Sequence, residues 1–329
     1  MTRFSGFDVI GDVHGCYAAL RELLDQLGYV RERGRYRHRD RRRPRQVLFL
    51  GDLIDRGPAI RDTVLLVQEM AAAGQAQLIL GNHEHHAVLC CTPAPAELGR
   101  PWLRPRTERN MRVLEATLEE FANHPLDWRD FLAWCRTLPL FLDMGSFRLI
   151  HACWDERLLG AFRERCPDGV IDAALLLESA TPGTFGARLL WRSTSGLTLQ
   201  FPEGRSLTGQ DGVQRRNFRS KFWVREPATL GDLEFQPDRL PDDLAALPLS
   251  DEQRAELVCY DADQPPLLVG HYWLRGRPRQ LTRNIACLDY SAVLHGRLVA
   301  YRMDGEREID NSKFVWVDGT PLEEMTYIG

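Results

Sequence analysis

Three short apolar runs each lead into a glycine and a cluster of polar residues, and this repeated pattern constrains the fold more than any other feature of the chain. The clusters are Gly-Asp-Val-His at 11–14, Gly-Asp-Leu-Ile-Asp-Arg-Gly at 51–57 and Gly-Asn-His-Glu at 81–84. The runs that precede them, 7–10, 46–50 and 77–80, are strand-like, whereas 16–27 and 62–73 have apolar residues at helical spacing. Strands that alternate with helices predict βαβ units and a mostly parallel sheet.

The rest of the chain adds helices and a second group of strands. Helical spacing extends over about 105–138, where Pro139 ends it, and again over 155–185, after a strand at 147–150. Three later runs are strand-like, at 267–269, 285–288 and 298–301. We therefore expect a second sheet packed on the first. We also expect one domain over 1–329, with a helical insertion at about 85–140 and a loop-rich insertion at about 195–265.

The three polar clusters are expected to meet in space. In open α/β sheets, sites form outside the carboxyl ends of the strands. Aspartate, asparagine and histidine supply oxygen and nitrogen ligands that suit divalent metals, and the glycines allow the tight turns that bring these side chains together. Alternatively, Asp12, Asp52 and Asn82 could each cap the helix that follows. Three clusters with the same kind of neighbours favour a metal site.

The order of these motifs resembles the signature of a known family. Asp-x-His, Gly-Asp-x-x-Asp-Arg-Gly and Gly-Asn-His-Glu are similar to the motifs of calcineurin-like metallophosphoesterases, especially of the phosphoprotein phosphatase branch. Ile-His-Ala at 150–152 and Val-Gly-His at 269–271 fit the same pattern. Within the branch, the likeness is to bacterial serine/threonine phosphatases and symmetrical diadenosine tetraphosphate hydrolases, and it runs from about 7 to 301. The resemblance implies an α/β fold, a calcineurin-like αββα sandwich of two mixed sheets flanked by helices.

The resemblance also implies a site with two divalent metal ions. Asp12 and His14 would bind the first metal, Asp52 would bridge both, and the second metal would be completed by Asn82, His151 and His271. A bridging carboxylate can hold two cations about 3.5–4 Å apart, which suits hydrolysis by a shared water. Manganese is the favoured metal, and iron, zinc, nickel or cobalt could also occupy such sites.

The same resemblance assigns catalytic roles to four further residues. Arg56 would hold the phosphate oxygens, His83 would protonate the leaving oxygen and Asp55 would orient His83. A second phosphate-binding arginine is expected downstream, and Arg192 after the apolar pair 189–190 is our choice. Arg215 and Arg216 are the alternatives to it.

These roles predict hydrolysis of phosphate monoesters, on phosphoproteins or small molecules, by in-line attack of a hydroxide that bridges the metals. A dinucleoside polyphosphate hydrolase, acting on diadenosine tetraphosphate with the same site, is the alternative. A non-catalytic phosphate-binding module is the third alternative. It is remote, since a module that had lost catalysis would be expected to lack some of these residues, and all six ligand positions and His83 are present.

Several residues near the motifs allow two interpretations. Trp273 could form a pocket wall for a base or a phosphopeptide, or it could pack in the core. His85 and His86 are expected to be a helix-packed or solvated pair rather than ligands. Asp289 could support the metal ligands from behind or belong to a turn.

Residues 31–45 contain nine arginines, in a chain whose net charge is −4. We expect an exposed basic hairpin, and a polyphosphate or RNA patch is the alternative. The segment enters the strand at 46–50 from the end opposite the polar cluster. Since a five-residue strand is about 17 Å long, direct participation in catalysis is not expected. The slightly acidic pI of about 6.2 makes nucleic acid a possible but not a favoured partner.

The chain lacks the features of an exported or membrane-bound protein. Its first residues contain no apolar signal region, and no stretch approaches 18 apolar residues. The eight cysteines form no Cys-x-x-Cys pair, which favours reduced thiols. We expect a cytoplasmic protein whose partner is a phosphorylated substrate: a phosphoprotein, a nucleotide or a small phosphoester.

Overall fold

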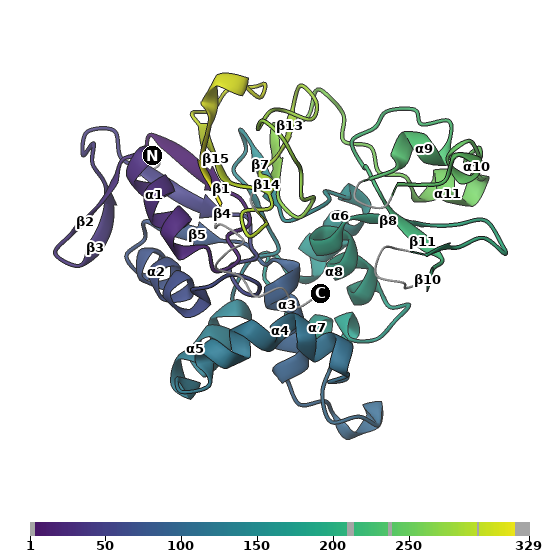
Figure 1. The fold of residues 1–329 in the computed structure, drawn as a ribbon, viewed down its shortest axis with the longest axis horizontal. Helices are drawn as coiled ribbons and strands as arrows, with labels where there is room; N and C mark the ends of the chain where they lie inside the picture. The colour runs from purple at the N-terminus through teal and green to yellow at the C-terminus, as the bar shows by residue number, and fades with distance from the viewer. Residues whose placement is uncertain (1–3, 209–213, 236–238, 295, 320–329) are drawn as a thin grey trace.

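Two β-sheets lie face to face at the centre of the molecule, with helices on their outer sides (Figure 1). This computed structural model describes residues 4–208, 214–235, 239–294 and 296–319. The first sheet has six strands in the order β14-β15-β1-β4-β5, with β16 pairing β15. Its strands are β1 (Gly6–Ile10), β4 (Arg45–Phe49), β5 (Ala76–Leu78), β14 (Asp289–Tyr290), β15 (Arg297–Met303) and β16 (Phe314–Asp318). β1, β4 and β5 are parallel, and β15 runs antiparallel to β1.

The second sheet has four strands in the order β13-β12-β7-β6. These are β6 (Phe141–Asp143), β7 (Arg148–Ile150), β12 (Leu267–Val269) and β13 (Ile285–Cys287). β7, β12 and β13 are parallel, whereas β6 is antiparallel to β7. The two sheets share one buried apolar cluster, in which Val9 and Leu48 of the first sheet meet Leu149 and Leu268 of the second. The expected sandwich of two mixed sheets flanked by helices is confirmed.

The helices cover the outer faces of both sheets. α1 (Tyr17–Leu27) and α2 (Ile60–Ala72) pack on the first sheet, and α6 (Glu156–Arg165) packs Phe162 against Phe141 of the second. α3 (Asn82–Cys91), the short 3₁₀ helix η1 (Ala96–Leu98), α7 (Ala173–Ser179) and α8 (Phe185–Ser195) lie nearby (Figure 1). None of the described helices has the length and apolar character needed to cross a membrane.

The long helical run expected over 105–138 is two helices, α4 (Glu108–Phe121) and α5 (Pro125–Cys135). Pro125 occupies the first turn of α5, where its missing N–H costs nothing. The helical region expected over 155–185 is likewise divided between α6, α7 and the start of α8.

The segment 195–265, expected to be rich in loops, contains short elements that pair mostly with one another. β8 (Leu197–Gln200) pairs with β11 (Asn217–Ser220), and β9 (Leu207–Thr208) pairs with β10 (Gln214–Arg215). Its helices are α9 (Leu230–Leu233), α10 (Asp242–Ala245) and α11 (Asp251–Glu256). Residues 209–213 and 236–238 of this segment lie outside the described residues. The 3₁₀ helix η2 (Asn311–Lys313) precedes β16.

The arginine-rich segment forms the expected hairpin. β2 (Tyr29–Glu32) and β3 (Arg35–His38) pair with each other and project from the edge of the molecule (Figure 1). The chain then enters β4 at Arg45, at the end of the strand away from the cluster at 51–57. The predicted hairpin and its separation from that cluster are confirmed.

Candidate metal centre

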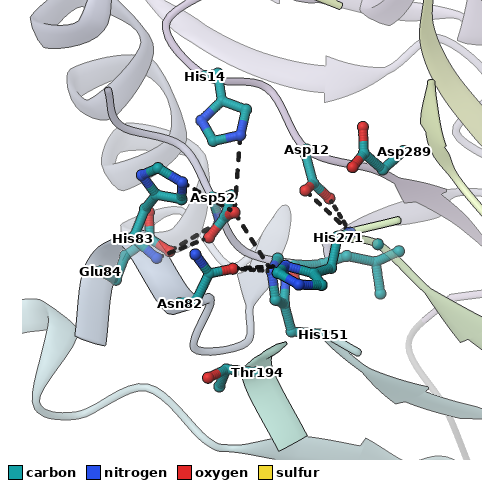
Figure 2. Close-up of polar contacts among 12 residues, drawn as sticks. Asp12, His14, Asp52, Asn82, His83, Glu84, His151, Thr194, His271 and Asp289 are labelled. Carbon is teal, nitrogen blue, oxygen red and sulfur yellow. Dashed lines mark hydrogen bonds and ion pairs between the residues drawn. The ribbon is translucent and has the colours of Figure 1, made fainter. Parts of the chain in front are cut away.

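All six predicted ligands follow the carboxyl end of a parallel strand. Asp12 and His14 follow β1, Asp52 follows β4 and Asn82 begins α3 after β5. In the second sheet, His151 follows β7 and His271 follows β12. Because the sheets face each other, the ends of these five strands bring the six side chains to one place, as Figure 2 shows. The expectation that the polar clusters meet is confirmed.

Asp52 is at the centre of this group. Its Oδ2 lies 3.3 Å from Nε2 of His151, 3.7 Å from Nε2 of His14 and 3.8 Å from Nε2 of His83. Burial by itself would raise the pKa of the Asp52 carboxyl, but the imidazoles of His151 and His83 hold it well below its ordinary value. Two groups of side chains could each hold a metal ion: His14, Asp52 and His83, and Asp52, His151 and His271. Asp52 is common to both groups, as a bridging ligand must be.

Backbone carbonyls orient two of the imidazoles. Nδ1 of His14 lies 2.7 Å from the carbonyl oxygen of Ile54, and Nδ1 of His151 lies 2.6 Å from that of Leu50. A carbonyl accepts only, so each Nδ1 carries the hydrogen and donates it. Nε2 is therefore the ring atom that each histidine directs toward Asp52, which is the arrangement that a metal-binding histidine needs. Burial holds the pKa of His14 well below its ordinary value, so its Nε2 presents a lone pair. At His151 burial is outweighed by the charges of Asp52 and Asp12, which raise the pKa to about 10, so its Nε2 must lose a proton when a metal binds.

The surroundings of Asn82 test whether a cation fits the second group. Its side-chain oxygen lies 2.9 Å from Nε2 of His151 and 2.8 Å from Nδ1 of His271. The Asp52 carboxylate and the Thr194 carbonyl lie 3.2 and 3.1 Å from the same position. The carboxylate and the carbonyl accept only, and the imidazole nitrogens accept when they are deprotonated. An amide nitrogen turned toward these atoms, or a cation between them, then satisfies all four. A donor set of two imidazoles, a carboxylate and an amide oxygen fits a divalent metal.

Asp12 has a different set of contacts from the one expected for a ligand of the first metal. Its two carboxylate oxygens accept hydrogen bonds from the His271 backbone N–H at 3.3 and 3.1 Å. Burial and the neighbouring charge of Asp289 raise the pKa of Asp12 well above its ordinary value. Asp12 therefore lies beside the cluster (Figure 2), and its role as a metal ligand stays a prediction.

Gly270 leaves the space that the Asp12 carboxylate occupies. A Cβ atom added at Gly270 would lie 2.1 Å from Oδ1 of Asp12, far inside van der Waals contact. Replacing Gly270 by Ala should therefore displace Asp12 and weaken metal binding by roughly 10- to 100-fold. Titration of the metal-free protein with manganese measures the effect. Gly160→Ala is the control, because a Cβ atom there meets nothing within 4 Å in helix α6. Unchanged manganese affinity in Gly270→Ala would show that Asp12 is not needed at the site.

His83 and Asp55 form the expected pair. Nδ1 of His83 lies 2.5 Å from Oδ2 of Asp55, and both side chains are buried. The Thr117 hydroxyl donates to the other oxygen of Asp55, so the carboxylate is held from both sides. This arrangement leaves Nε2 of His83 directed toward Asp52, and the role of His83 as a proton donor stays a prediction.

Arg56 reaches the same cluster from the loop after β4. Its two terminal nitrogens lie 3.1 Å from Nε2 of His14 and 3.1 Å from Nε2 of His83. Its guanidinium lies 4.5 Å from the ring centroid of Trp273, a cation–π contact. Trp273 is half-buried, and its backbone N–H donates to Asp289 at 2.9 Å. Trp273 thus lies beside the phosphate-binding candidate. Asp289 also accepts a hydrogen bond from the backbone N–H of Ser291 at 2.9 Å, and support of the metal ligands by Asp289 stays a prediction.

The backbone at the cluster is strained. Positive φ angles occur at nine described residues other than glycine, and six of them belong to this site: His14, Asp52, Asp55, Arg56, His271 and Trp273. Such angles are costly for residues with a Cβ atom and persist only where the surrounding structure enforces them. Six strained residues at one place indicate that the positions of their side chains are maintained at a cost in backbone energy, as is common at functional sites.

Glu84 holds part of this strained backbone in place, although no role for Glu84 was predicted from the sequence. Its two oxygens accept hydrogen bonds from the backbone N–H groups of Asp52 and Leu53, both at 2.8 Å. Burial and the charge of Asp52 raise the pKa of Glu84 to about 7. Glu84 is one helical position after His83, so the motif Asn-His-Glu contained the residue without indicating that it supports the Asp52 loop.

The structure gives Arg192 carboxylate partners. It lies in the last turn of α8 and donates to Asp155 at 3.1 Å and to Glu256 at 2.9 Å. Another arginine, Arg219 of β11, has an electrostatic effect on the predicted ligand His271. Burial lowers the pKa of His271 most, and the positive charge of Arg219 lowers it further. Alternation along a short strand could have suggested Arg219, but no local motif marks it. Of the earlier alternatives, Arg215 ends β10 and Arg216 lies between β10 and β11.

The neighbouring histidines of α3 are packed within the protein, as expected. His85 contacts the Ser179 hydroxyl at 3.0 Å and His86 contacts the Asn110 carbonyl at 2.8 Å. Burial lowers the pKa of His85 to about 3 and that of His86 to about 4, so both stay neutral.

Comparisons with known proteins agree with this geometry. A model of the calcineurin-like phosphoesterase family matches residues 6–193. The asymmetrical bis(5'-nucleosyl)-tetraphosphatase PrpE of Oceanobacillus iheyensis is 45% identical over 183 residues, which cover 54% of this chain and 67% of the relative. A symmetrical bis(5'-nucleosyl)-tetraphosphatase of Aromatoleum aromaticum is 31% identical over 143 residues, 44% of this chain and 42% of the relative.

Other similarities are more limited. A solved protein serine/threonine phosphatase from Saccharomyces cerevisiae aligns with 97% of this chain and 81% of its own, at 14% identity and a TM-score of 0.49. That likeness carries no argument about function. The chain spans less than half of the symmetrical relative, and for one further bacterial relative the share is 30%. The alignments by themselves therefore do not transfer a whole relative's activity to this chain.

Proposed function

The chain belongs to the calcineurin-like phosphoesterase family, and from that premise we propose that it is a metal-dependent hydrolase of dinucleoside polyphosphates such as diadenosine tetraphosphate. The observation that carries the proposal is the position of Asp52, which is common to two groups of side chains able to hold a metal ion. The relatives named above support the substrate class, since both are tetraphosphatases of dinucleosides.

Two divalent cations are the cofactor of this proposal, with manganese favoured and iron, zinc, nickel or cobalt also suitable. Their ligands would be Asp12, His14, Asp52, Asn82, His151 and His271. When bound, such cations supply the Lewis acidity that makes water nucleophilic near neutral pH and neutralises charge on the phosphate. The protein supplies the placement of the ligands, which carbonyl contacts fix at His14 and His151.

Other residues of the chain would bind the substrate and move the proton. Arg56 can present two N–H groups to phosphate oxygens, because its guanidinium is held over Trp273 with its terminal nitrogens in the cluster. His83 would give the proton on Nε2 to the departing oxygen, with Asp55 fixing its ring through Nδ1. Arg192 would have to leave Asp155 and Glu256 in order to bind phosphate. Arg219 is therefore a further candidate for the second phosphate-binding arginine.

Phosphate monoesters, including phosphoproteins, were the first expectation from the sequence and are now the second candidate. The site chemistry serves both substrate classes, because an ester and an anhydride are both attacked at phosphorus. The tetraphosphatase relatives favour the anhydride. Trp273 supports the same choice, because an aromatic ring beside the phosphate-binding arginine is suited to stacking a base.

A comparison of substrates tests this choice. Manganese-loaded protein should hydrolyse diadenosine tetraphosphate with a kcat/KM about 100-fold or more above that for a phosphoserine peptide, since binding energy from the bases adds to transition-state stabilisation. Chromatography of the nucleotide products gives the rate and also the bond that is cut. Products of equal size indicate symmetrical cleavage, and unequal products indicate asymmetrical cleavage. A peptide rate that equals or exceeds the dinucleotide rate would reverse the order of the two candidates.

We propose two further features of the protein, its domain organisation and its compartment. The family match ends at 193, and we propose that 1–329 nonetheless form one domain, in which the insertions at about 85–140 and 195–265 form the walls around the substrate. The eight cysteines form no disulfide, and we propose the cytoplasm as the compartment.

A further inference from the structure

The arginine-rich hairpin borders a cavity at the end of the first sheet that lies opposite the metal centre. The cavity has a volume of about 330 Å³, and Arg35, Arg37 and Arg41 line it together with Phe4, Pro44 and Ala73. β4 begins beside it at Arg45 and leads away to Asp52. Since a five-residue strand spans about 17 Å, a ligand in this cavity does not touch the metal ligands.

We propose that this cavity binds a linear phosphate chain, carried by a nucleoside polyphosphate or present as inorganic polyphosphate. Arginine suits such a ligand because its planar fork donates two parallel hydrogen bonds to phosphate oxygens. The volume lies at the lower end of the range for small-molecule sites. The mixture of three guanidiniums with an apolar side leaves room for phosphates and for part of a nucleoside.

The protein neutralises only part of the charge around the cavity. Arg31 pairs with Glu69, Arg39 with Asp25, Arg41 with Glu32 and Arg45 with Asp8. Arg35 and Arg37 have no carboxylate within ion-pair distance in the described part of the chain. They are two positions apart on β3, so both project from the same face of the hairpin. Two adjacent guanidiniums repel each other, and an anion between them removes the repulsion.

The walls of the cavity are held in place before any ligand binds. The Tyr29 hydroxyl of β2 donates to the buried Asp8 at 2.9 Å, and Arg45 donates to the other oxygen of Asp8 at 2.9 Å. The Tyr29 ring packs edge-on against His38 of β3, with centroids 5.3 Å apart. These contacts fix the hairpin to β1 and β4, so little entropy is lost when a ligand binds.

The loop after the hairpin is ordered as well. Oδ1 of Asp40 accepts hydrogen bonds from the backbone N–H groups of Arg42 and Arg43, at 2.9 and 3.1 Å. This turn sets the direction of Arg41 and Pro44, which line the cavity. The side chains of Arg42 and Arg43 are exposed and do not line it. The chain therefore offers two neighbouring pairs of arginines, one in the cavity and one outside it.

Calorimetric titration of the full chain with sodium tripolyphosphate tests the proposal. Prior treatment with a chelator removes the metals through which the catalytic centre would hold phosphate. Wild-type protein should bind one tripolyphosphate. The double variant Arg35→Gln/Arg37→Gln should bind it about tenfold or more weakly, because hydrogen bonds from charged donors are the strong ones. The double variant Arg42→Gln/Arg43→Gln removes the same charge and should change the affinity little.

Two further arms separate the sources of the phosphate chain from other anions. Adenosine triphosphate that binds tighter than tripolyphosphate supports a nucleotide ligand, and equal affinities support the phosphate chain alone. A single-stranded RNA that binds tighter than both, with equal losses in the two double variants, would overturn the proposal in favour of an extended basic surface. Absence of tripolyphosphate binding to the wild type would overturn it too. Both double variants should keep the wild-type melting temperature and rate on p-nitrophenyl phosphate.

Discussion

Replacing Asp52 by Asn will lower the hydrolysis rate by roughly 10³-fold or more and will lower the occupancy of both metal positions together. The size follows from the several kcal/mol that a metal ion contributes to phosphoryl transfer, at about 1.4 kcal/mol for each tenfold. Both positions are affected because Asp52 contacts His14 and His83 on one side and His151 on the other. An amide oxygen carries no charge and binds divalent cations more weakly than a carboxylate.

Elemental analysis of the purified variant, together with its rate on diadenosine tetraphosphate, measures this effect. Asp130→Asn is a matched control, because Asp130 is exposed and pairs only with the adjacent Arg129 among the described residues. Circular dichroism of both variants checks that they are folded. If Asp52→Asn keeps two tightly bound metals per chain, Asp52 is not the bridge.

His83→Asn tests proton donation, and its effect should depend on the leaving group. A general acid contributes roughly 10²–10⁴-fold when the departing oxygen needs a proton. We therefore expect a large loss with an alkyl phosphate and a small loss with p-nitrophenyl phosphate. Across substituted phenyl phosphates, the logarithm of the rate should fall more steeply with leaving-group pKa in the variant than in the wild type.

The competing explanation is that His83 supports the site or binds a metal, since it lies in one of the two groups able to hold an ion. That role predicts equal losses for all leaving groups and lower metal occupancy. Metal content is therefore measured on the same samples. His124→Asn serves as the control, because it changes a histidine outside the cluster at the start of α5. Equal losses at full occupancy, with chemistry rate-limiting, would reject the acid role.

The strand ends of the site could be predicted from the sequence because each is marked locally. Gly51 has φ near 100°, and a Cβ atom there would lie 2.6 Å from Gly81, so the glycines that suggested tight turns are needed where two strand ends meet. The apolar runs that precede these glycines identify the buried strands. The hairpin at 29–38 was predictable for a similar reason, since its arginines alternate with other residues around Gly34.

Other parts depend on contacts that leave no local mark. Arg192 was chosen from the residues before it, but its position in α8 directs it to Asp155 and Glu256, and Glu256 is distant in sequence. Glu84 supports the Asp52 loop across about thirty residues of chain. In both cases a tertiary partner decides the role. The division between α4 and α5 is different, because Pro125 marks it locally: proline interrupts the predicted helical run and occupies the first turn of α5.

The proposed hydrolysis depends on metal ions bound by Asp52 and its neighbours, and one measurement tests this dependence most directly. Protein stripped with a chelator is assayed on diadenosine tetraphosphate while manganese is added back, and bound metal is counted in the same samples by elemental analysis. We predict no hydrolysis in the stripped protein and a return of activity that follows the binding of two ions per chain. Full activity in protein without measurable metal would contradict a metal-dependent mechanism.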